Sequence, residues 1–365
     1  MRKRVVVVLI VAIVAAGAWW FFFRSSSRGE DEVLIANADD LKATVVTPHL
    51  ECPIEDGKNV LWCATFQLAW NEACDLIGED IHLEDEPAMV AVMNKKTATK
   101  ADLDEASYLA IAGYVKDGIL DRIPQAVRDK FGERAPTRLA DTTTLDESDN
   151  GFAAYACLVK DLRFAKPFES LDDGELEFMG TPVRAFGLAD PDGKANTREL
   201  MKQVILYSED WRGNEIICEL KTTSPHDRLI LAMVHPKGTL QETIADIHKR
   251  MADGYPQSTL VELMIPKLNF DLLKDYSELI GKTLKVRNPE LKDWFFVMAA
   301  QSIRFQLNEQ GAKLRSEARM ENVKSMKPMP AVFNKPFLIM LQRKDAKQPY
   351  FALWVDNVEL LMAVD

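Results

Sequence analysis

The sequence predicts an α+β protein whose folded part follows an apolar N-terminal segment. Helical and strand patterns alternate without the regular spacing of βαβ units, which favours α+β over a doubly wound sheet. Segments with helical spacing gather early in the chain, and extended apolar segments gather late. The 365 residues, 47% of them hydrophobic, suffice for one large core or for two ordinary domains.

The N-terminus carries a targeting signal. Arg2, Lys3 and Arg4 precede an uncharged apolar run over residues 5–23. As a helix with a rise of ~1.5 Å per residue, this run just spans a hydrocarbon core of ~30 Å. Its small residues lie inside the run and not after it, so a retained transmembrane anchor is favoured over a cleaved signal peptide. Either interpretation exports the rest of the chain.

The chain is predicted to have four parts, namely a cytoplasmic tail (1–4), an anchor (5–23), a polar linker (24–40) and one folded domain (41–365). The formal net charge of −11 argues against a nucleic-acid partner, which would require a basic face. We expect a monomer, anchored in the membrane and facing the extracytoplasmic side, or secreted if the N-terminal segment is cleaved.

Two helices are predicted in the first part of the domain. Val60–Leu76 is apolar at helical spacing, with Asn59 as its N-cap. Ala101–Phe131 has the pattern of an amphipathic helix with a break near Pro124.

Strands dominate the remainder of the prediction. Gly151–Phe164 is long and apolar, as in a central strand. Thr259–Phe270 is predicted to be a strand whose proline marks an edge or a bulge. A short helix is expected at Leu240–Met251. The other predicted strands are Gln203–Tyr207, Glu215–Leu220 and Arg228–Val234, which would form a meander, and Trp294–Asn308, Pro336–Arg343 and Tyr350–Val355 near the C-terminus.

No pattern in the sequence indicates enzymatic chemistry. None of the five histidines stands in a zinc-binding pair, and nucleophile elbows, phosphate loops and dinucleotide fingerprints are absent from the sequence. We therefore expect no catalytic residue, no metal and no cofactor. Whether a disulfide joins two of Cys52, Cys63 and Cys74 stays open.

Several separated segments resemble the serpin family in the order in which that family uses them. The helix expected after Asn59–Trp62 resembles the family's buried second helix. Ile111–Val127 is similar to the helix that lies across the main sheet. Phe152–Phe168, which ends in Lys-Pro-Phe, resembles the third strand of that sheet, and Val261–Phe270 resembles the family's apolar-Pro-Lys-Phe strand with Leu268 inserted.

The C-terminal segments carry the most specific part of the resemblance. Asn308-Glu309-Gln310-Gly311 is similar to the hinge of the reactive-centre loop, and Val332–Phe337 is similar to the start of the buried C-terminal strands. Gly311 and Phe333 stand 22 positions apart, a spacing typical of the family.

The resemblance implies a serpin fold with large mixed and antiparallel sheets, and inhibition of a serine protease by an exposed loop. After cleavage, such a loop inserts into the main sheet as a new strand and distorts the attached protease. The residues implied for the hinge are Glu309, Gln310, Gly311, Ala312, Leu314, Ser316 and Ala318. Loop length places the scissile bond at Ser325–Met326, and a shift of one residue places Lys324 at the specificity position, which would suit a trypsin-like target.

Insertion as a strand requires side chains that suit the two faces of a sheet. Successive side chains of a strand face opposite sides. Small or apolar residues alternate with charged residues from Ala312 to Glu321, a pattern that permits insertion. Leu314, Arg315 and Glu317 depart from the small residues that inhibitory members carry there.

Other departures from the family pattern weaken the expectation that the main sheet gains stability when the loop inserts. The family's polar cluster beneath the sheet is replaced here by Cys63, Phe66, Ala156 and Gln301, and Phe164 stands where tryptophan is usual. The segment between Cys74 and Leu109 is short, so a helix and an outer strand of the main sheet are expected to be missing. The alternative hypothesis is therefore a non-inhibitory serpin-fold binding module with a degenerate hinge.

Overall fold

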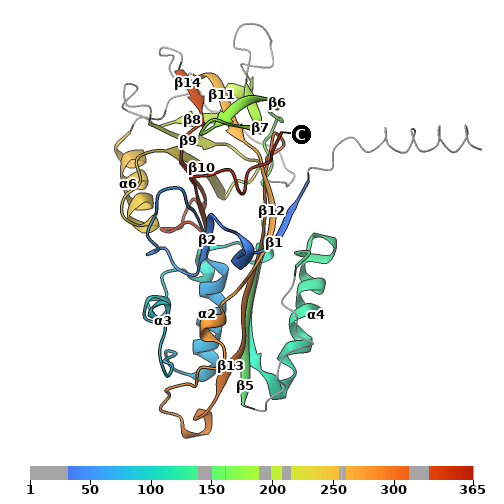
Figure 1. Cartoon of the computed structure of the whole chain (residues 1–365), viewed down its shortest axis with the longest axis vertical. Coiled ribbons are helices and arrows are strands. Elements are labelled where there is room, and N and C mark those ends of the chain that lie inside the picture. The colour runs from blue at the N-terminus through green and yellow to red at the C-terminus, as the bar shows by residue number, and fades with distance from the viewer. Residues whose placement is uncertain are drawn as a thin grey trace, which may run out of the picture. The chain divides into compact units, whose positions relative to one another are not determined.

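The computed structural model describes residues 32–138, 150–160, 162–188, 199–207, 215–254, 256, 260–311 and 329–364. Its contacts separate Met1–Val33 from a unit formed by Leu34–Asp365, and this unit contains three β-sheets (Figure 1). The predicted tail and anchor lie outside the described residues. Within the described ranges, the structure contains no helix that is long and apolar enough to span a bilayer.

The first sheet has five strands in the order β1-β12-β13-β5-β4. β13 and β5 are parallel, in register from Phe295 opposite Gly151 to Arg304 opposite Val159, and we call this pair the central seam. Antiparallel partners flank the seam, β12 beside β13 and β4 beside β5. The strand bounds are β1 (Leu34–Asn37), β12 (Leu268–Asp275), β13 (Phe295–Leu307), β5 (Gly151–Val159) and β4 (Tyr108–Tyr114).

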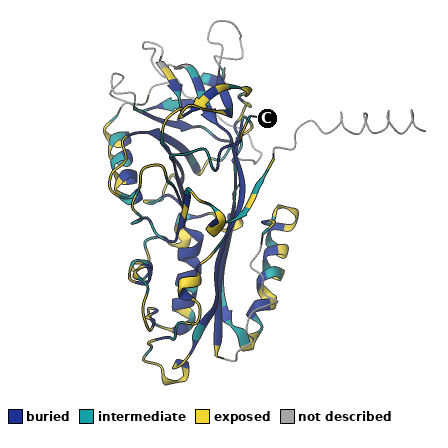
Figure 2. Cartoon of the chain, in the orientation of Figure 1, coloured by how far each residue is buried: buried dark blue, intermediate teal, exposed yellow. Residues whose placement is uncertain are grey.

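Helices cover both faces of this sheet, which explains why all nine residues of β5 are buried. α2 (Thr65–Ile77) and α3 (Ala88–Met93) share a core cluster with Phe152, Ala154 and Ala156 of β5. α4 (Ile119–Phe131) packs with the alternate residues of β5, including Tyr155, on the opposite face. The outer side of α4 is exposed (Figure 2).

The second sheet has seven strands in the order β2-β3-β16-β15-β10-β9-β8. α6 (Leu240–Asp253) packs against its core, and α6 begins with a capping box between Thr239 and Glu242. The strand bounds are β2 (Thr44–Thr47), β3 (Asn59–Cys63), β16 (Phe351–Val355), β15 (Phe337–Arg343), β10 (Asp227–Met233), β9 (Ile216–Leu220) and β8 (Val204–Leu206).

The third sheet has four strands in the order β14-β11-β7-β6. A single residue, Lys267, separates β11 of this sheet from β12 of the first sheet. The strand bounds are β14 (Met329–Val332), β11 (Leu260–Pro266), β7 (Thr181–Leu188) and β6 (Glu169–Phe178). Short 3₁₀ helices occur at Ala38–Asp40, Lys100–Asp102, Glu105–Ser107, Val115–Asp117, Gly132–Arg134, Ser277–Leu279 and Pro289–Leu291.

The structure confirms the α+β class and most of the expected strands. The predicted central strand is β5, and the predicted meander is β8, β9 and β10, which are antiparallel neighbours. The predicted short helix is α6, and the three C-terminal strands are β13, β15 and β16. Strands are not confined to the later part of the chain, however, because β1 to β5 all precede residue 160.

The predicted helix over Val60–Leu76 was wrong in its first turn. Asn59–Cys63 forms β3, and the helix begins only at Thr65. All five residues of β3 are buried between β2 and β16, so the strand lacks the alternation that would have distinguished it from a helix. Asn59 does not cap a helix, because its side-chain oxygen accepts hydrogen bonds from the backbone N–H groups of Asp356 and Asn357.

The predicted amphipathic helix over Ala101–Phe131 was also wrong in its first half. Tyr108–Tyr114 forms β4, and Gly118, with a φ of +74°, ends the turn that separates the strand from α4. Pairing with β5 overrides the helical pattern of this segment. Pro124 lies inside α4, and the helix continues to Phe131.

Two further differences concern segment boundaries. Thr259–Phe270 was predicted as one strand, but it contributes to β11 and β12, and Pro266 is the last residue of β11 and not an edge or bulge marker. Leu34–Asn37 was predicted as linker, but it forms β1, parallel to β12, because its apolar residues extend the first sheet.

Candidate functional site

The directions of β13 and β5 would allow a further strand to pair with both of them at the central seam. The chain leaves β13 at Leu307, so a segment that turned back from there would run antiparallel to β13. Because β5 is parallel to β13, the same segment would also run antiparallel to β5. Two antiparallel ladders would replace one parallel ladder, and parallel pairing is slightly less stable per residue.

A tight turn at Asn308–Gly311 follows β13 and lies against the segment that follows β5. The N–H of Gly311 donates to the carbonyl of Asn308 over 3.0 Å. The N–H of Phe164 donates to the Gln310 carbonyl over 3.0 Å, and the N–H of Phe168 donates to the Glu309 carbonyl over 2.8 Å. The segment that follows β13 and the segment that follows β5 are therefore joined by backbone hydrogen bonds.

Only a glycine fits position 311 in this arrangement. Gly311 has a φ of +101°, and a Cβ built on it would lie 2.5 Å from the carbonyl oxygen of Leu162 and 2.6 Å from the nitrogen of Phe164. Both atoms belong to the backbone and cannot move away as a flexible side chain could. This close approach fixes the position of the turn against the end of β5.

A buried lysine holds the same turn by its charge. The Lys267 side chain is only 2% exposed, and its Nζ lies 2.8 Å from a carboxylate oxygen of Glu309 and 2.8 Å from one of Asp172. It also donates to the Ser170 hydroxyl over 2.6 Å. Burial alone would lower the pKa of Lys267, but the two carboxylates outweigh it and raise that pKa. We call this group the Lys267 cluster, and it ties the turn to β6.

A second polar group lies beneath the seam. The Tyr276 hydroxyl donates to Gln301 Oε1 over 3.0 Å, and Gln301 Nε2 donates to the Thr65 hydroxyl over 2.7 Å and to the Cys63 carbonyl over 3.1 Å. Phe66 stacks on the Tyr276 ring at a centroid distance of 3.9 Å. Cys63, Phe66 and Ala156 are buried as expected, yet Gln301 keeps a satisfied hydrogen-bonding group at this level.

The segment after α4 crosses the opposite face of the sheet. The N–H of Thr137 donates to Asp271 Oδ2 over 2.6 Å. The Ser302 hydroxyl donates to the carbonyl of Arg138 over 2.8 Å, and the Tyr155 hydroxyl donates to Ser302 over 2.8 Å. Ser302 and Tyr155 belong to β13 and β5, so this segment is fastened directly over the seam.

Asp271, which receives this segment, is fully buried. Among the described residues its Oδ1 has no hydrogen-bond partner. Burial raises the pKa of Asp271, and the hydrogen bond from Thr137 and the charges of Arg304 and Arg138 offset this only in part.

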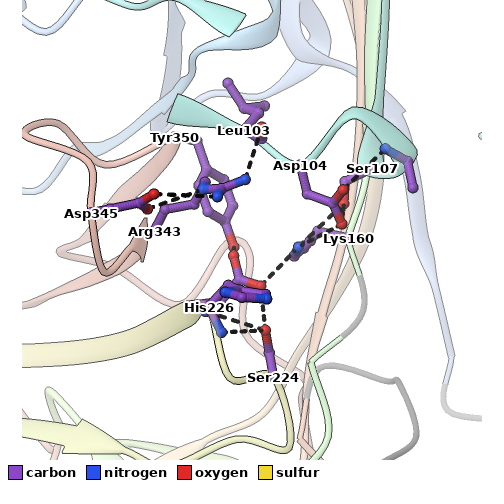
Figure 3. A network of polar contacts seen from close by, with 11 residues as sticks. Leu103, Asp104, Ser107, Lys160, Ser224, His226, Arg343, Asp345 and Tyr350 are labelled. Atoms are coloured by element: carbon purple, nitrogen blue, oxygen red, sulfur yellow. Dashed lines mark hydrogen bonds and ion pairs between the residues drawn. The ribbon is translucent and has the colours of Figure 1, made fainter. Parts of the chain in front are cut away.

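A third buried network holds the end of β5 (Figure 3). Lys160, the residue after β5, places its Nζ 2.9 Å from Asp227 Oδ2, and the two side chains are 5% and 4% exposed. The hydroxyls of Tyr350 and Ser224 donate to Asp227 over 3.0 and 2.6 Å. Burial, followed by the Asp227 charge, holds the pKa of Tyr350 well above its usual value. The end of β5 is thereby tied to β10 and β16 of the second sheet.

The structure places three of the residues that the sequence analysis assigned to the hinge. Glu309, Gln310 and Gly311 form the turn described above. The other hinge residues, Ala312, Leu314, Ser316 and Ala318, and the scissile candidates Lys324, Ser325 and Met326, lie outside the described residues.

Sequence reasoning missed the charges that surround the turn. Lys267 stood in the segment compared with the family's Pro-Lys-Phe strand, but it received no role. The sequence signal for its role was that Lys267 is a charged residue between two apolar strand patterns. Lys160 and Asp227 are separated by 67 positions, and nothing in the sequence pairs them.

The described residues include no group of three or more His, Cys, Asp or Glu side chains that could hold a metal ion. All five cysteines are free thiols in the structure, so none of Cys52, Cys63 and Cys74 is paired. Burial, as its largest cause, raises the pKa of Cys63 to about 11, which leaves that thiol protonated at neutral pH.

Comparison with known proteins places the chain near serpins in structure alone. No protein-family model matches the chain, and no curated protein sequence does. The thermophilic serpin tengpin in its native state is similar with 13% identity and a TM-score of 0.48, over 83% of this chain and 90% of that chain. A thyroxine-binding globulin in complex with thyroxine is similar with 12% identity and a TM-score of 0.45, over 82% of this chain and 93% of that chain.

A serpin from the trematode Schistosoma haematobium is similar with 12% identity and a TM-score of 0.43, over 66% of this chain and 63% of that chain. The chain is thus structurally similar to serpins at low sequence identity. At these identities and TM-scores, the likeness does not assign the chain to a family.

The Lys267 cluster generates a stability prediction. Replacing Lys267 by methionine should lower the free energy of unfolding by about 2–3 kcal/mol, less than the ~3–5 kcal/mol of a fully buried pair because both carboxylates are partly solvated. Urea unfolding of the full chain measures this change. The control is Lys95→Met, which removes an exposed pair with Glu51 and should cost less than about 1 kcal/mol. Equal effects in the two variants would contradict a clamping role for Lys267.

Asp271 and Asp172 should show opposite pH dependences. The folded-state pKa of Asp271 is raised above its usual 3.8, so the folded chain holds this proton longer, and its contribution to stability falls as the pH rises from about 4. Asp271→Asn removes this loss, so the unfolding free energy of the variant relative to the parent should rise between about pH 4 and 7.

Asp172 provides the matched comparison. Burial would raise its pKa, but hydrogen bonds from Lys267 and Ser170 lower it, so its contribution is present above 3.8 and is lost as the pH falls through its folded-state pKa. Asp172→Asn should therefore cost more stability as the pH rises through this acid range. Urea unfolding of both variants across the pH range checks the two signs, and parallel curves would refute the assignment.

Proposed function

We propose that this chain is a serpin-family inhibitor of an extracytoplasmic serine protease, acting through a cleavable loop within residues 312–328. The observation that carries the proposal is the parallel seam between β13 and β5, which lies directly beside the Asn308–Gly311 turn. The chain that leaves this turn has the direction needed to enter the seam as a strand antiparallel to both neighbours. The alternating pattern from Ala312 onward supports its ability to form such a strand.

The proposed mechanism depends on the seam, where an inserted strand would form new backbone hydrogen bonds with both β13 and β5. A protease cleaves the loop at Ser325–Met326, or after Lys324 if it is trypsin-like. The residues after Gly311 then enter between β13 and β5, and the acylated protease is carried with them. Entry requires β5 to part from β13, beginning at Val159, where the turn at Gly311 and the Lys267 cluster mark the end of the paired seam.

The proposed setting follows from the N-terminal sequence. Residues 5–23 would hold the chain in the membrane, with the folded domain facing an extracytoplasmic protease and with no cofactor required. Cleavage after this segment would release the same domain.

A non-inhibitory binding module is the second candidate, and one observation favours it. The Lys160 network ties the end of β5 to the second sheet through side chains that are about 5% exposed. Separating β5 from β13 would strain this buried ion pair. Leu314 and Glu317 add bulk and charge at positions where rapid insertion favours small residues.

Incubation of the full chain with trypsin tests the proposal. We expect a covalent complex that survives denaturation, and a cleaved product that melts about 10 °C or more above the intact chain, since each kcal/mol gained shifts the melting temperature of a large domain by ~2–4 °C. Lys324→Gln should remove trypsin cleavage after position 324, whereas the matched variant Lys327→Gln should leave that cleavage unchanged. Ala312→Arg should keep cleavage but abolish the complex, because a charged side chain would enter the sheet.

Clean cleavage without a complex, together with an unchanged melting temperature, would reject inhibition and support the binding module. Absence of trypsin cleavage after Lys324 would reject the trypsin-like assignment of the specificity position.

A further inference from the structure

The edge strand β4 differs from the other sheet edges in the described part of the chain. Exposed edges are normally short, charged or interrupted by proline, which prevents pairing with another chain. β1, β2 and β14 have four residues each, and β8 has three. β6 is long but carries five acidic residues. β4 has seven residues, Tyr-Leu-Ala-Ile-Ala-Gly-Tyr, with neither a charge nor a proline.

One side of β4 is paired and the other is available. Its register with β5 runs from Tyr108 opposite Leu158 to Tyr114 opposite Phe152. On the outer side, no strand of the described ranges pairs with β4. In an antiparallel strand, alternate residues direct both their N–H and C=O groups to the unpaired side.

The side chains of β4 remain apolar up to this open edge. Leu109 and Ile111 pack against the α4 side, and Ala110 and Ala112 pack against the α2 side. All four are only partly buried, whereas every residue of the adjacent β5 is buried. A further strand beside β4 would complete their burial.

The sequence of β4 is nearly the same in both directions, which identifies the partner. With Ile111 on a two-fold axis, an antiparallel second copy places Tyr108 opposite Tyr114 and Ala110 opposite Ala112. Leu109 falls opposite Gly113, which leaves room for the larger side chain. In an isologous interface residue i meets residue j and residue j meets residue i. Here that exchange places tyrosine opposite tyrosine and leucine opposite glycine at both ends of the pair, so the β4 strand is complementary to a second copy of itself.

We propose that two copies of this chain associate through antiparallel pairing of their β4 strands, which joins the two five-stranded sheets into one. The two-fold axis is perpendicular to the joined sheet, so both copies of α4 lie on the same face. This departs from the monomer expected from the sequence. β4 lies between the interface and β5, so the line along which β13 meets β5 is two strands away from the interface.

Position 111 allows a charge-exchange test, because this residue faces itself across the axis. In the full chain purified in detergent, sedimentation should give a protein mass of twice 41.2 kDa for the parent. Ile111→Lys and Ile111→Glu should each weaken association at least about tenfold, since like charges directly opposite are destabilising. An equimolar mixture of the two variants should recover the dimer as a heterodimer.

The control is Val45→Lys on β2, another exposed apolar residue on an edge strand, at 42% exposure. This variant should associate as the parent does. A parent that sediments as a monomer overturns the proposal, as would happen if another segment or a peptide occupied the edge. Undiminished association of Ile111→Lys, or failure of the mixture to recover the dimer, overturns it as well.

A second variant decides the question if the charged variants do not fold. Directly opposed residues have Cβ atoms about 4.5–5.5 Å apart, close to the separation in a disulfide. Ile111→Cys should therefore cross-link under mild oxidation into a reducible dimer, in excess over the parent, which contains the half-buried Cys52. Val45→Cys should not cross-link. Equal cross-linking at both positions, or none at position 111, refutes the pairing.

Discussion

The parallel pairing of β13 with β5 is the constraint on which the rest of the first sheet depends. Parallel strands cannot be joined by a hairpin, and here the chain forms β6 to β11, α6 and β12 between β5 and β13. Both faces of the seam are covered, so β5 can be apolar throughout. The same pairing means that a strand added between β13 and β5 could gain two antiparallel neighbours.

Polar groups are concentrated around the seam, whereas its interior is apolar. Lys267 and Glu309 lie at its upper end, Gln301 lies beneath it, and Asp271 receives the segment that crosses it. Each of these groups would have to keep or exchange partners if β13 and β5 separated. Buried polar groups are costly when unpaired, so these contacts set the barrier to any rearrangement.

Much of the fold could be predicted from the sequence wherever periodicity and length agreed. β5, β13 and α6 are long or strongly patterned, and their predicted positions hold. The predictions for β3 and β4 failed because short, mostly apolar segments carry no alternation. Their strand state comes from pairing with β16 and β5. At the candidate site, Gly311 could be found from local sequence, but the lysine clusters could not, because Lys267 and Asp172 are distant in sequence and meet only in the folded chain.

β1 has a consequence for the proposed tether. A fully flexible linker over residues 24–40 could extend roughly 60 Å at ~3.5 Å per residue. Because Leu34–Asn37 belongs to the first sheet, only residues 24–33 remain before it, with a maximum contour length of ~35 Å. If the apolar run stays in the bilayer, the first strand of the domain is held within ~35 Å of the membrane surface. A protease anchored in the same membrane would then be met by a two-dimensional search.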